Sequence, residues 1–174
     1  MLGRKPVVSN SSPLIWLAKI GRLTLLKSLF GEIVIPMRVY EESALRKRSA
    51  DAVLIAKAVE DGWIEVSEER MEEADVIVGA SGIHLGEAEA ILLAQKLDTE
   101  LIIDEREASA TAQIFGVRPI GTIAVLLLAL ARDRITLREF RECLDSLITS
   151  GFWLTVDVYN KALEEAESIA KRKN

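Results

Sequence analysis

Five short apolar runs, each separated from the next by a longer segment with helical spacing, constrain the fold more than any other feature. The runs are Val7-Val8, Ile33-Val34-Ile35, Trp63-Ile64-Glu65-Val66, Leu101-Ile102-Ile103 and residues 117–120. Short strands that are apolar on both faces are typical of a parallel sheet covered by helices on both sides. The pattern therefore predicts an α/β fold. No linker, repeat or low-complexity tract interrupts the 174 residues, so we expect a single domain over residues 1–174.

The helices between these runs are predicted from apolar spacing and from breaker residues. Ser12 as N-cap and Pro13 as the first helical residue start the first helix, which Gly21 interrupts. Further helices are expected over 39–48, 50–59, 87–97, 108–115, 122–131, 137–148 and 161–171, with a short one in the Glu-rich segment after residue 66 and a short extended segment over 152–154.

Composition excludes several classes of function. The formal net charge is −5, and aromatic residues make up 5% of the chain, so neither a basic nucleic-acid coat nor a base-stacking platform is expected. One cysteine, Cys143, and one histidine, His84, are too few for a structural zinc site, a disulfide framework or a two-histidine catalytic pair. We expect Cys143 to be a buried, inert thiol. An enzyme that binds cations through carboxylates remains compatible with this composition.

Nucleotide-binding and membrane motifs are absent from the sequence. No G-x-G-x-x-G follows the first run, and the P-loop-like spacing of residues 116–122 has Thr122 where lysine is required. The longest apolar run, 123–131, is shorter than the ~20 residues that cross a bilayer. Since no signal-peptide core is present either, we expect a cytoplasmic protein without membrane contact. Basic residues at Arg46-Lys47-Arg48 fit a nucleic-acid contact or a solvated helix end.

Polar residues gather where the predicted strands end. Asn10 follows the first strand, Asp104 the fourth and Thr122 the fifth. Glu41 and Glu42 lie on the helix after the second strand, and Glu87 and Glu89 lie at the start of the helix before the fourth. Functional groups of open parallel sheets collect at the carboxyl ends of the strands. Because hard oxygen ligands from separate segments suit Mg²⁺ or Mn²⁺, the set predicts a site that can hydrolyse phosphodiesters.

Each of these residues also has an ordinary structural explanation. Asp104 with Glu107 three residues later matches a helix capping box. Glu87 fits a first-turn acid favoured by the helix dipole. Glu41 and Glu42 fit a solvated helix face, and Asn10 fits a turn residue. At the level of single residues, both explanations stay open.

The order and spacing of the motifs resemble those of a known family. The opening segment, residues 7–15, resembles the first motif of PIN domains, the fold of the VapC-type toxin ribonucleases, and is closest to a PIN-like branch of archaea and bacteria. Supporting stretches are Ala18-Lys19-Ile20-Gly21-Arg22-Leu23, Ile35-Pro36, Val39-Tyr40-Glu41-Glu42, Leu85-Gly86-Glu87-Ala88-Glu89-Ala90-Ile91, Ile102-Ile103-Asp104-Glu105 and Pro119-Ile120-Gly121-Thr122. The resemblance covers about residues 7–159.

The resemblance implies a three-layer α/β/α sandwich with a parallel sheet of roughly five strands, and cleavage of RNA with Mg²⁺ or Mn²⁺. The implied metal-binding and catalytic positions are Asn10, Glu42, Glu87 and Asp104, with Ser12, Glu41, Glu105 and Thr122 as supporting polar groups. Related toxins pair with a small antitoxin protein and commonly form homodimers. Trp16 and Trp153 suit either interface, although core packing is the simpler expectation for both.

Two positions depart from the family pattern. Asn10 stands where active PIN nucleases usually have aspartate, and Ala108-Ser109 stands where the branch pattern has an arginine. An amide can bind a hard cation through its oxygen but adds no negative charge. The resemblance therefore leaves two hypotheses: a metal-dependent endoribonuclease of the VapC toxin type, or a catalytically weak or inactive PIN-fold module that binds RNA or an antitoxin-like partner.

Overall fold

A parallel five-stranded sheet forms the centre of the molecule. The structure, a computed structural model, describes residues 5–45 and 48–173. The strands are β1 (Val7–Ser9), β2 (Ile33–Pro36), β3 (Ile64–Ser67), β4 (Leu101–Ile102) and β5 (Pro119–Ile120), in the order β3-β2-β1-β4-β5. Every neighbouring pair is parallel. The expected α/β fold with about five parallel strands is confirmed.

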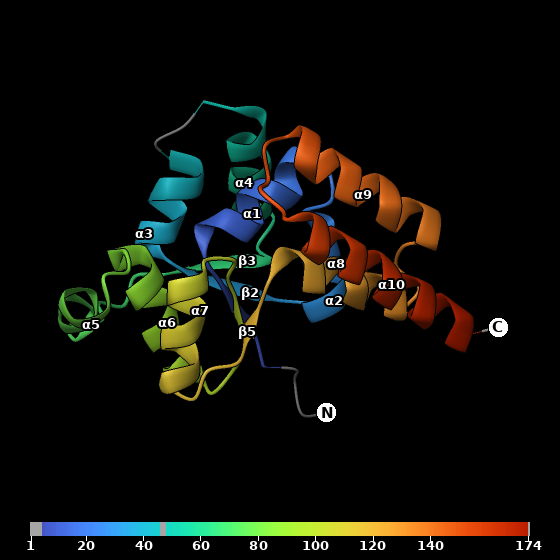
Figure 1. Cartoon of the computed structure of the whole chain (residues 1–174). Helices are drawn as coiled ribbons and strands as arrows, with labels where there is room; N and C mark the ends of the chain where they lie inside the picture. Colours follow the sequence, from blue (N-terminus) through green and yellow to red (C-terminus); the bar gives the residue numbers. More distant parts are fainter. Residues whose placement is uncertain (1–4, 46–47, 174) are drawn as a thin grey trace.

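Helices cover both faces of this sheet (Figure 1). They are α1 (Ser11–Lys19), α2 (Thr24–Phe30), α3 (Met37–Tyr40), the π-helical turn η1 (Glu41–Leu45), α4 (Ala50–Glu60), α5 (Ala74–Ser81), α6 (Leu85–Leu97), α7 (Arg106–Ile114), α8 (Thr122–Ala131), α9 (Leu137–Thr149) and α10 (Val156–Arg172). Helices α6 and α7 lie on one side of the sheet, and α1, α4 and α8 lie on the other (Figure 1). The expected three layers are therefore present.

Alternate residues of β1, β2 and β4 supply two separate hydrophobic cores. Val7 and Ile102 point into the larger core with α1, α2, α4, α8, α9 and α10. Val8, Leu101 and Ile103 point into the smaller core, whose helical side is rich in alanine from α6 and α7. Side chains of a strand alternate between its two faces, so a strand buried on both faces must be apolar at every position. This is why the runs of β1, β2 and β4 were visible in the sequence.

The strand order reverses direction next to β1. From β1 the chain first builds β2 and β3 on one side, and then crosses through α5 and α6 to add β4 and β5 on the other side. In open α/β sheets, the crevice outside the carboxyl ends of the strands at such a switch point is the usual ligand site. Asn10 directly follows β1, and Asp104 follows β4, so both residues lie at this point.

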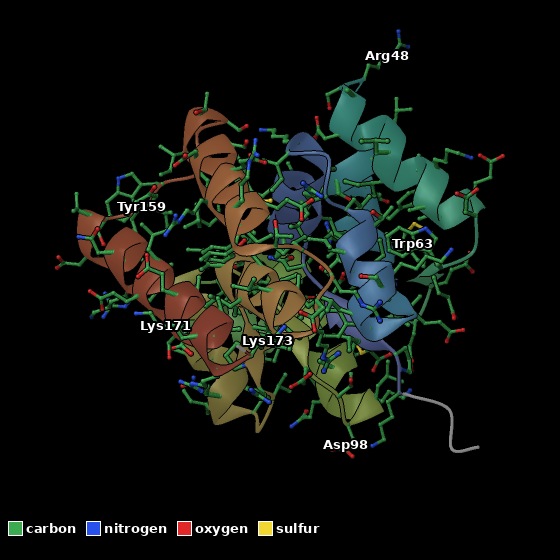
Figure 2. All side chains as sticks on the ribbon, turned by 90° about the vertical axis from the view of Figure 1, so that its right-hand side faces the viewer. Arg48, Trp63, Asp98, Tyr159, Lys171 and Lys173 are labelled. Carbon is green, nitrogen blue, oxygen red and sulfur yellow. The ribbon has the colours of Figure 1, made fainter. Side chains whose placement is uncertain are left out.

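Several boundaries differ from the sequence prediction. Helix α1 begins at Ser11 with Asn10 as its N-cap residue, so Ser12 is not the cap and Pro13 is the third helical residue. The helix expected in the Glu-rich segment lies later, at α5, and residues 152–154 form no strand. Helix α10 begins at Val156, five residues before the expected start. Arg46 and Lys47 of the basic run lie outside the described residues; Arg48 is exposed (Figure 2).

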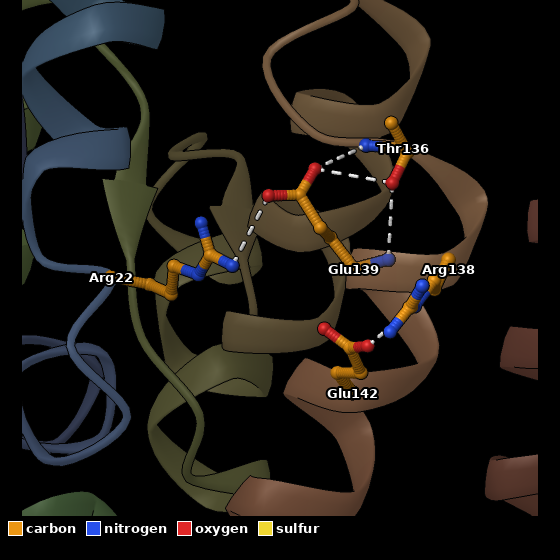
Figure 3. Close-up of polar contacts among 5 residues, drawn as sticks. All are labelled: Arg22, Thr136, Arg138, Glu139 and Glu142. Atoms are coloured by element: carbon orange, nitrogen blue, oxygen red, sulfur yellow. Dashed lines mark hydrogen bonds and ion pairs between the residues drawn. The ribbon is translucent and has the colours of Figure 1, made fainter.

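The C-terminal helices are tied to the rest of the molecule by polar contacts. Thr136 and Glu139 form a capping box at the start of α9, in which the Glu139 carboxylate accepts a bond of 2.8 Å from the Thr136 N–H (Figure 3). The same carboxylate accepts a bond of 3.3 Å from Arg22, in the loop between α1 and α2 (Figure 3). At the end of α10, Lys173 (Figure 2) donates a bond of 2.8 Å to the carbonyl of Leu130 in α8.

Three expectations about single side chains have different outcomes. Cys143 is buried, as expected, and burial raises the pKa of its thiol. Trp16 packs partly buried against the larger core, with its ring edge-to-face on Phe152 at 5.4 Å. Trp153 is 82% exposed, so the expectation of core packing was wrong there. None of the helices in the described part of the chain combines the length and apolar character that a bilayer crossing requires.

Candidate functional site

Asn10 occupies the centre of the polar region at the carboxyl ends of the strands. Its backbone N–H donates a bond of 2.8 Å to the carbonyl of Ile102, which continues the ladder between β1 and β4. Its side chain is almost entirely buried, and Nδ2 donates a bond of 3.2 Å to Glu105 Oε2. The amide oxygen Oδ1 is buried without a hydrogen-bond partner among the described residues. A buried polar atom left without a partner is unfavourable, so this oxygen is available to a ligand.

Asp104 is held by the start of α8 and of α1. The backbone N–H of Thr122 donates to Oδ1 at 2.7 Å, and the Thr122 hydroxyl donates to Oδ2 at 2.8 Å. The Ser12 hydroxyl donates to Oδ2 at 3.2 Å. Burial raises the pKa of the Asp104 carboxyl, the bonds from Thr122 oppose this rise, and the neighbouring Glu105 charge adds to it. The carboxylate thus sits at the first residue of α8, where a helix dipole stabilises negative charge.

The predicted capping box of Asp104 with Glu107 is wrong. Helix α7 begins at Arg106, its N-cap residue is Glu105, and no side chain caps it. The capping rule considers only neighbours along the chain. Asp104 instead accepts hydrogen bonds from Thr122, which lies close to it because α7 and β5 return the chain to the end of β4. Ser12 and Thr122, predicted as supporting polar groups, both contact this carboxylate.

Glu87 begins helix α6 and has a structural role that sequence reasoning had allowed. Its Oε2 accepts a bond of 2.7 Å from the backbone N–H of His84, three residues earlier. Burial raises the pKa of the Glu87 carboxyl, the bond from His84 lowers it, and the charges of Glu105 and Glu42 raise it further. Glu105 and Glu42 therefore each lie close enough to Glu87 for their charges to act on its carboxyl.

Glu42 lies against Ser11 and Gly86 at the ends of the strands. It lies on the π-helical turn η1. Such turns are rare in proteins, but those that occur are often found at functional sites. The Ser11 hydroxyl donates to its Oε2 at 3.3 Å. Both of its carboxylate oxygens lie against Gly86, where a Cβ would be only 3.1 and 3.2 Å away. Gly86 therefore leaves the space that the Glu42 carboxylate occupies.

The four carboxylates are each turned toward a different donor. Asp104 faces Thr122 and Ser12, Glu42 faces Ser11, Glu87 faces the His84 N–H, and Glu105 faces Asn10. Like charges repel, and separate donors stabilise them apart. Consistent with this, no three Asp, Glu, His or Cys side chains within residues 5–45 and 48–173 are gathered closely enough to hold a metal ion.

The donor set nevertheless fits a hard cation in its chemistry. The side chains at the switch point offer oxygen only: four carboxylates and the unpartnered Oδ1 of Asn10. Oxygen-only sets suit Mg²⁺ or Mn²⁺ and not zinc. Burial is the main cause of the raised pKa values of Glu87 and Asp104, and neighbouring carboxylates add to it; a bound dication would offset both effects.

Sequence reasoning missed Ser11 and Gly86. Ser11 stands beside the predicted Ser12, and Gly86 directly precedes the predicted Glu87. Neither has a signal of its own, because each acts only through Glu42, which lies 31 residues from Ser11. An adjacent glycine and acid at a helix start is a common pattern.

Comparison with known proteins gave one match. A family model described as a PIN domain matches residues 6–168, which includes every residue of the site described above. No curated protein and no solved structure matched the chain.

Proposed function

The chain belongs to the PIN-domain family, and from this premise we propose that it is a metal-dependent endoribonuclease of the VapC toxin type. PIN domains have a nuclease-type fold and generally use divalent metal ions. The observation that carries the proposal is the buried, unpartnered Oδ1 of Asn10 beside four carboxylates at the switch point of the sheet. We propose RNA as the substrate and the cytoplasm as the location.

We assign the metal-binding role to Asn10, Glu42, Glu87 and Asp104, with Mg²⁺ or Mn²⁺ as the ion. A divalent ion held there supplies Lewis-acid chemistry to a phosphodiester and lowers the pKa of water. The chain's own contribution is to hold the ligands in place. Thr122 and Ser12 hold the Asp104 carboxylate, and Ser11 and the His84 N–H hold Glu42 and Glu87, at the carboxyl ends of the strands. To bind one ion, these carboxylates would turn from their present donors toward it.

The test is RNA cleavage by the purified protein in Mn²⁺, in Mg²⁺ and in EDTA. We expect cleavage with either metal, none in EDTA, and none from the Asp104→Asn variant with metal. The amide introduced by this substitution is close in size to the carboxylate and can still accept the bond from the Thr122 N–H, so folding is preserved. Cleavage that survives this substitution, or that persists in EDTA, would contradict the proposal.

A second candidate function is favoured by two specific observations. Asn10 brings no charge, and both Asp104 oxygens are already occupied by donors from the chain. These features suit a PIN-fold module that binds RNA or an antitoxin-like protein without cutting. Calorimetric titration with Mn²⁺ separates the two candidates: no heat of binding up to millimolar metal supports the module and excludes the nuclease.

A protein partner is part of the proposal. Trp153 is 82% exposed and Val156 is 74% exposed, between α9 and the first residue of α10. Exposed aromatic and apolar side chains of this kind support a protein interface. We propose that the protein forms a homodimer and binds a small antitoxin protein. Light scattering after gel filtration tests the dimer, and a monomer at micromolar concentration would contradict it.

A further inference from the structure

We propose that Arg38 is a phosphate-binding residue that holds the RNA backbone beside the acid site. This inference rests on the proposed function, because it concerns the substrate of the same site. It starts from a cation that neither the fold nor the metal-binding role explains. The ligand class is a phosphodiester of single-stranded RNA.

The Nε of Arg38 has no hydrogen-bond partner among the described residues. Its side chain is 38% exposed, and its contact is an ion pair between Nε and Glu89 Oε1 at 3.6 Å. This separation is longer than a hydrogen bond, and Nε is buried without a hydrogen-bond partner among the described residues. A guanidinium has five N–H donors in a planar fork that matches phosphate oxygens. The buried Nε therefore holds the Arg38 guanidinium in one direction, while the exposed part of the group can still bind a ligand.

The position of Arg38 places this fork next to the proposed metal ligands. Arg38 lies on α3, and Glu42 follows four residues later on η1, with the helical path continuing between them. Residues four apart on a helix share a face, about 6 Å apart along its axis. Its partner Glu89 lies on α6, and the charges of both Arg38 and Glu42 act on the Glu89 carboxyl. Arg38 is thus a cation on the α3 side of the acid site, near Glu42.

The negative charge of the molecule explains why a cation is needed at this position. A protein of net charge −5 repels RNA at long range, and four carboxylates at the site add to the repulsion. A phosphate that approaches the site needs positive charge at that place. Glu89 keeps the guanidinium in position while RNA is absent, and its side chain is only 16% exposed. Phosphate binding then adds short, charge-assisted hydrogen bonds that the 3.6 Å contact lacks.

The experiment measures binding separately from cleavage. A short fluorescein-labelled single-stranded RNA is titrated with protein, and anisotropy is recorded over a range of salt concentrations. Binding is measured in Mn²⁺ on the Asp104→Asn background, which the proposed function predicts not to cut, and again in EDTA. The matched control is Arg138→Ala, because Arg138 is an exposed arginine on α9 that is also paired with a glutamate (Figure 3).

We expect Arg38→Ala to weaken RNA binding on the order of tenfold and to lower the slope of log affinity against log salt by about 0.7, the value for one single-strand phosphate. Arg38→Lys should keep the slope but lose part of the affinity, since lysine lacks the fork. Glu89→Gln should tighten binding, because it releases the guanidinium. Because this substitution also removes a negative charge near the RNA, the gain supports a role of Arg38 only if it disappears when Glu89→Gln is combined with Arg38→Ala. Arg138→Ala should change neither quantity.

Several outcomes would overturn the inference. One is an unchanged salt slope in Arg38→Ala; another is Glu89→Gln binding RNA no better than the parent protein. The absence of RNA binding by the parent in both solutions would overturn it as well. If Arg38→Ala does not fold, as judged by circular dichroism, the RNA affinity of Glu89→Gln and the affinity and salt slope of Arg38→Lys test the inference in its place. RNA cleavage that does not depend on metal refutes the proposed function alone, and cleavage with an unchanged Arg38→Ala slope refutes this inference alone.

Discussion

Replacing Asn10 with aspartate restores the residue usual in active PIN nucleases, and we expect it to destabilise the metal-free protein. The Asn10 Nδ2 donates a bond of 3.2 Å to Glu105 Oε2. In the Asn10→Asp variant, a carboxylate oxygen takes the place of that donor. An attraction becomes a repulsion between two partly buried charges, and the amide bond is lost.

The size of the effect follows from the distance. Two unit charges at the 3.2 Å separation of this pair repel by about 5 kcal/mol at an effective dielectric constant of about 20. The pair can escape by binding one proton, which at pH 7 costs about 4 kcal/mol for a carboxyl with a pKa near 4. Since Glu105 is only half-buried and can turn toward solvent, we expect a loss of about 2–4 kcal/mol in unfolding free energy.

The sign of the pH dependence is fixed by the same reasoning. The repulsion raises the affinity of the folded variant for a proton above that of the unfolded chain. The destabilisation therefore grows as the pH rises above about 4 and falls to at most about 1.4 kcal/mol at pH 5. Urea unfolding in EDTA at pH 5 and pH 7 measures both values. Mn²⁺ should offset the repulsion, so the variant should gain more stability from the metal than the parent does.

A charge-relocating double variant is the control. In Asn10→Asp with Glu105→Gln, the amide and the carboxylate exchange places, and the hydrogen bond can form again. We expect its unfolding free energy to lie within about 1 kcal/mol of the parent. The reasoning is refuted if the single variant is as stable as the parent at pH 7 in EDTA, or if the double variant is no more stable than the single one.

Three further predictions concern neighbouring residues. Glu87→Gln should raise the melting temperature by a few degrees at pH 7 but not below pH 4. The raised pKa of the Glu87 carboxyl costs stability as the pH rises through its ordinary value of 4.5, while glutamine still accepts the capping bond. An equal effect at all pH values would argue against this explanation. Thr122→Val should cost roughly 1–3 kcal/mol in urea unfolding, since the buried Asp104 carboxylate loses its hydroxyl donor, and Thr122→Ser should cost less than half of that. Gly86→Ala should weaken Mn²⁺ binding in calorimetry, because the new methyl group meets the Glu42 carboxylate at 3.1 Å. The folded state should lose no stability, since alanine favours the helix. Unchanged Mn²⁺ binding would show that Glu42 is not held there for the metal.

The sequence was sufficient for the sheet because burial on both faces leaves a local pattern. Runs such as Leu101-Ile102-Ile103 are apolar at every position, and the helices between them follow from spacing. The boundaries were less accurate where the pattern is weak, as at the start of α10. Trp153 was expected in the core because residue type predicts burial only on average, and its 82% exposure depends on where α9 ends.

The position of the polar residues at the strand ends was predictable, but their contacts were not. Asn10 and Asp104 followed from the rule that strand ends meet at one edge of the sheet. The contacts of Glu42 did not, because they depend on Ser11 and Gly86 and on a π-helical turn that no local pattern indicates. The partner of Asp104 was assigned wrongly for the same reason: Thr122 is 18 residues away along the chain and is brought close only when β4 and β5 pair.

The central place of β1 has a consequence for biosynthesis. This strand leaves the ribosome first, yet it pairs with β2 on one side and with the much later β4 on the other. Until residues 101–122 have been made, a nascent chain holds Asn10 beside an open strand edge, without Asp104 or its donor Thr122. The two halves of the sheet, and with them the polar residues at the ends of β1 and β4, therefore come together only after residues 101–122 have been made.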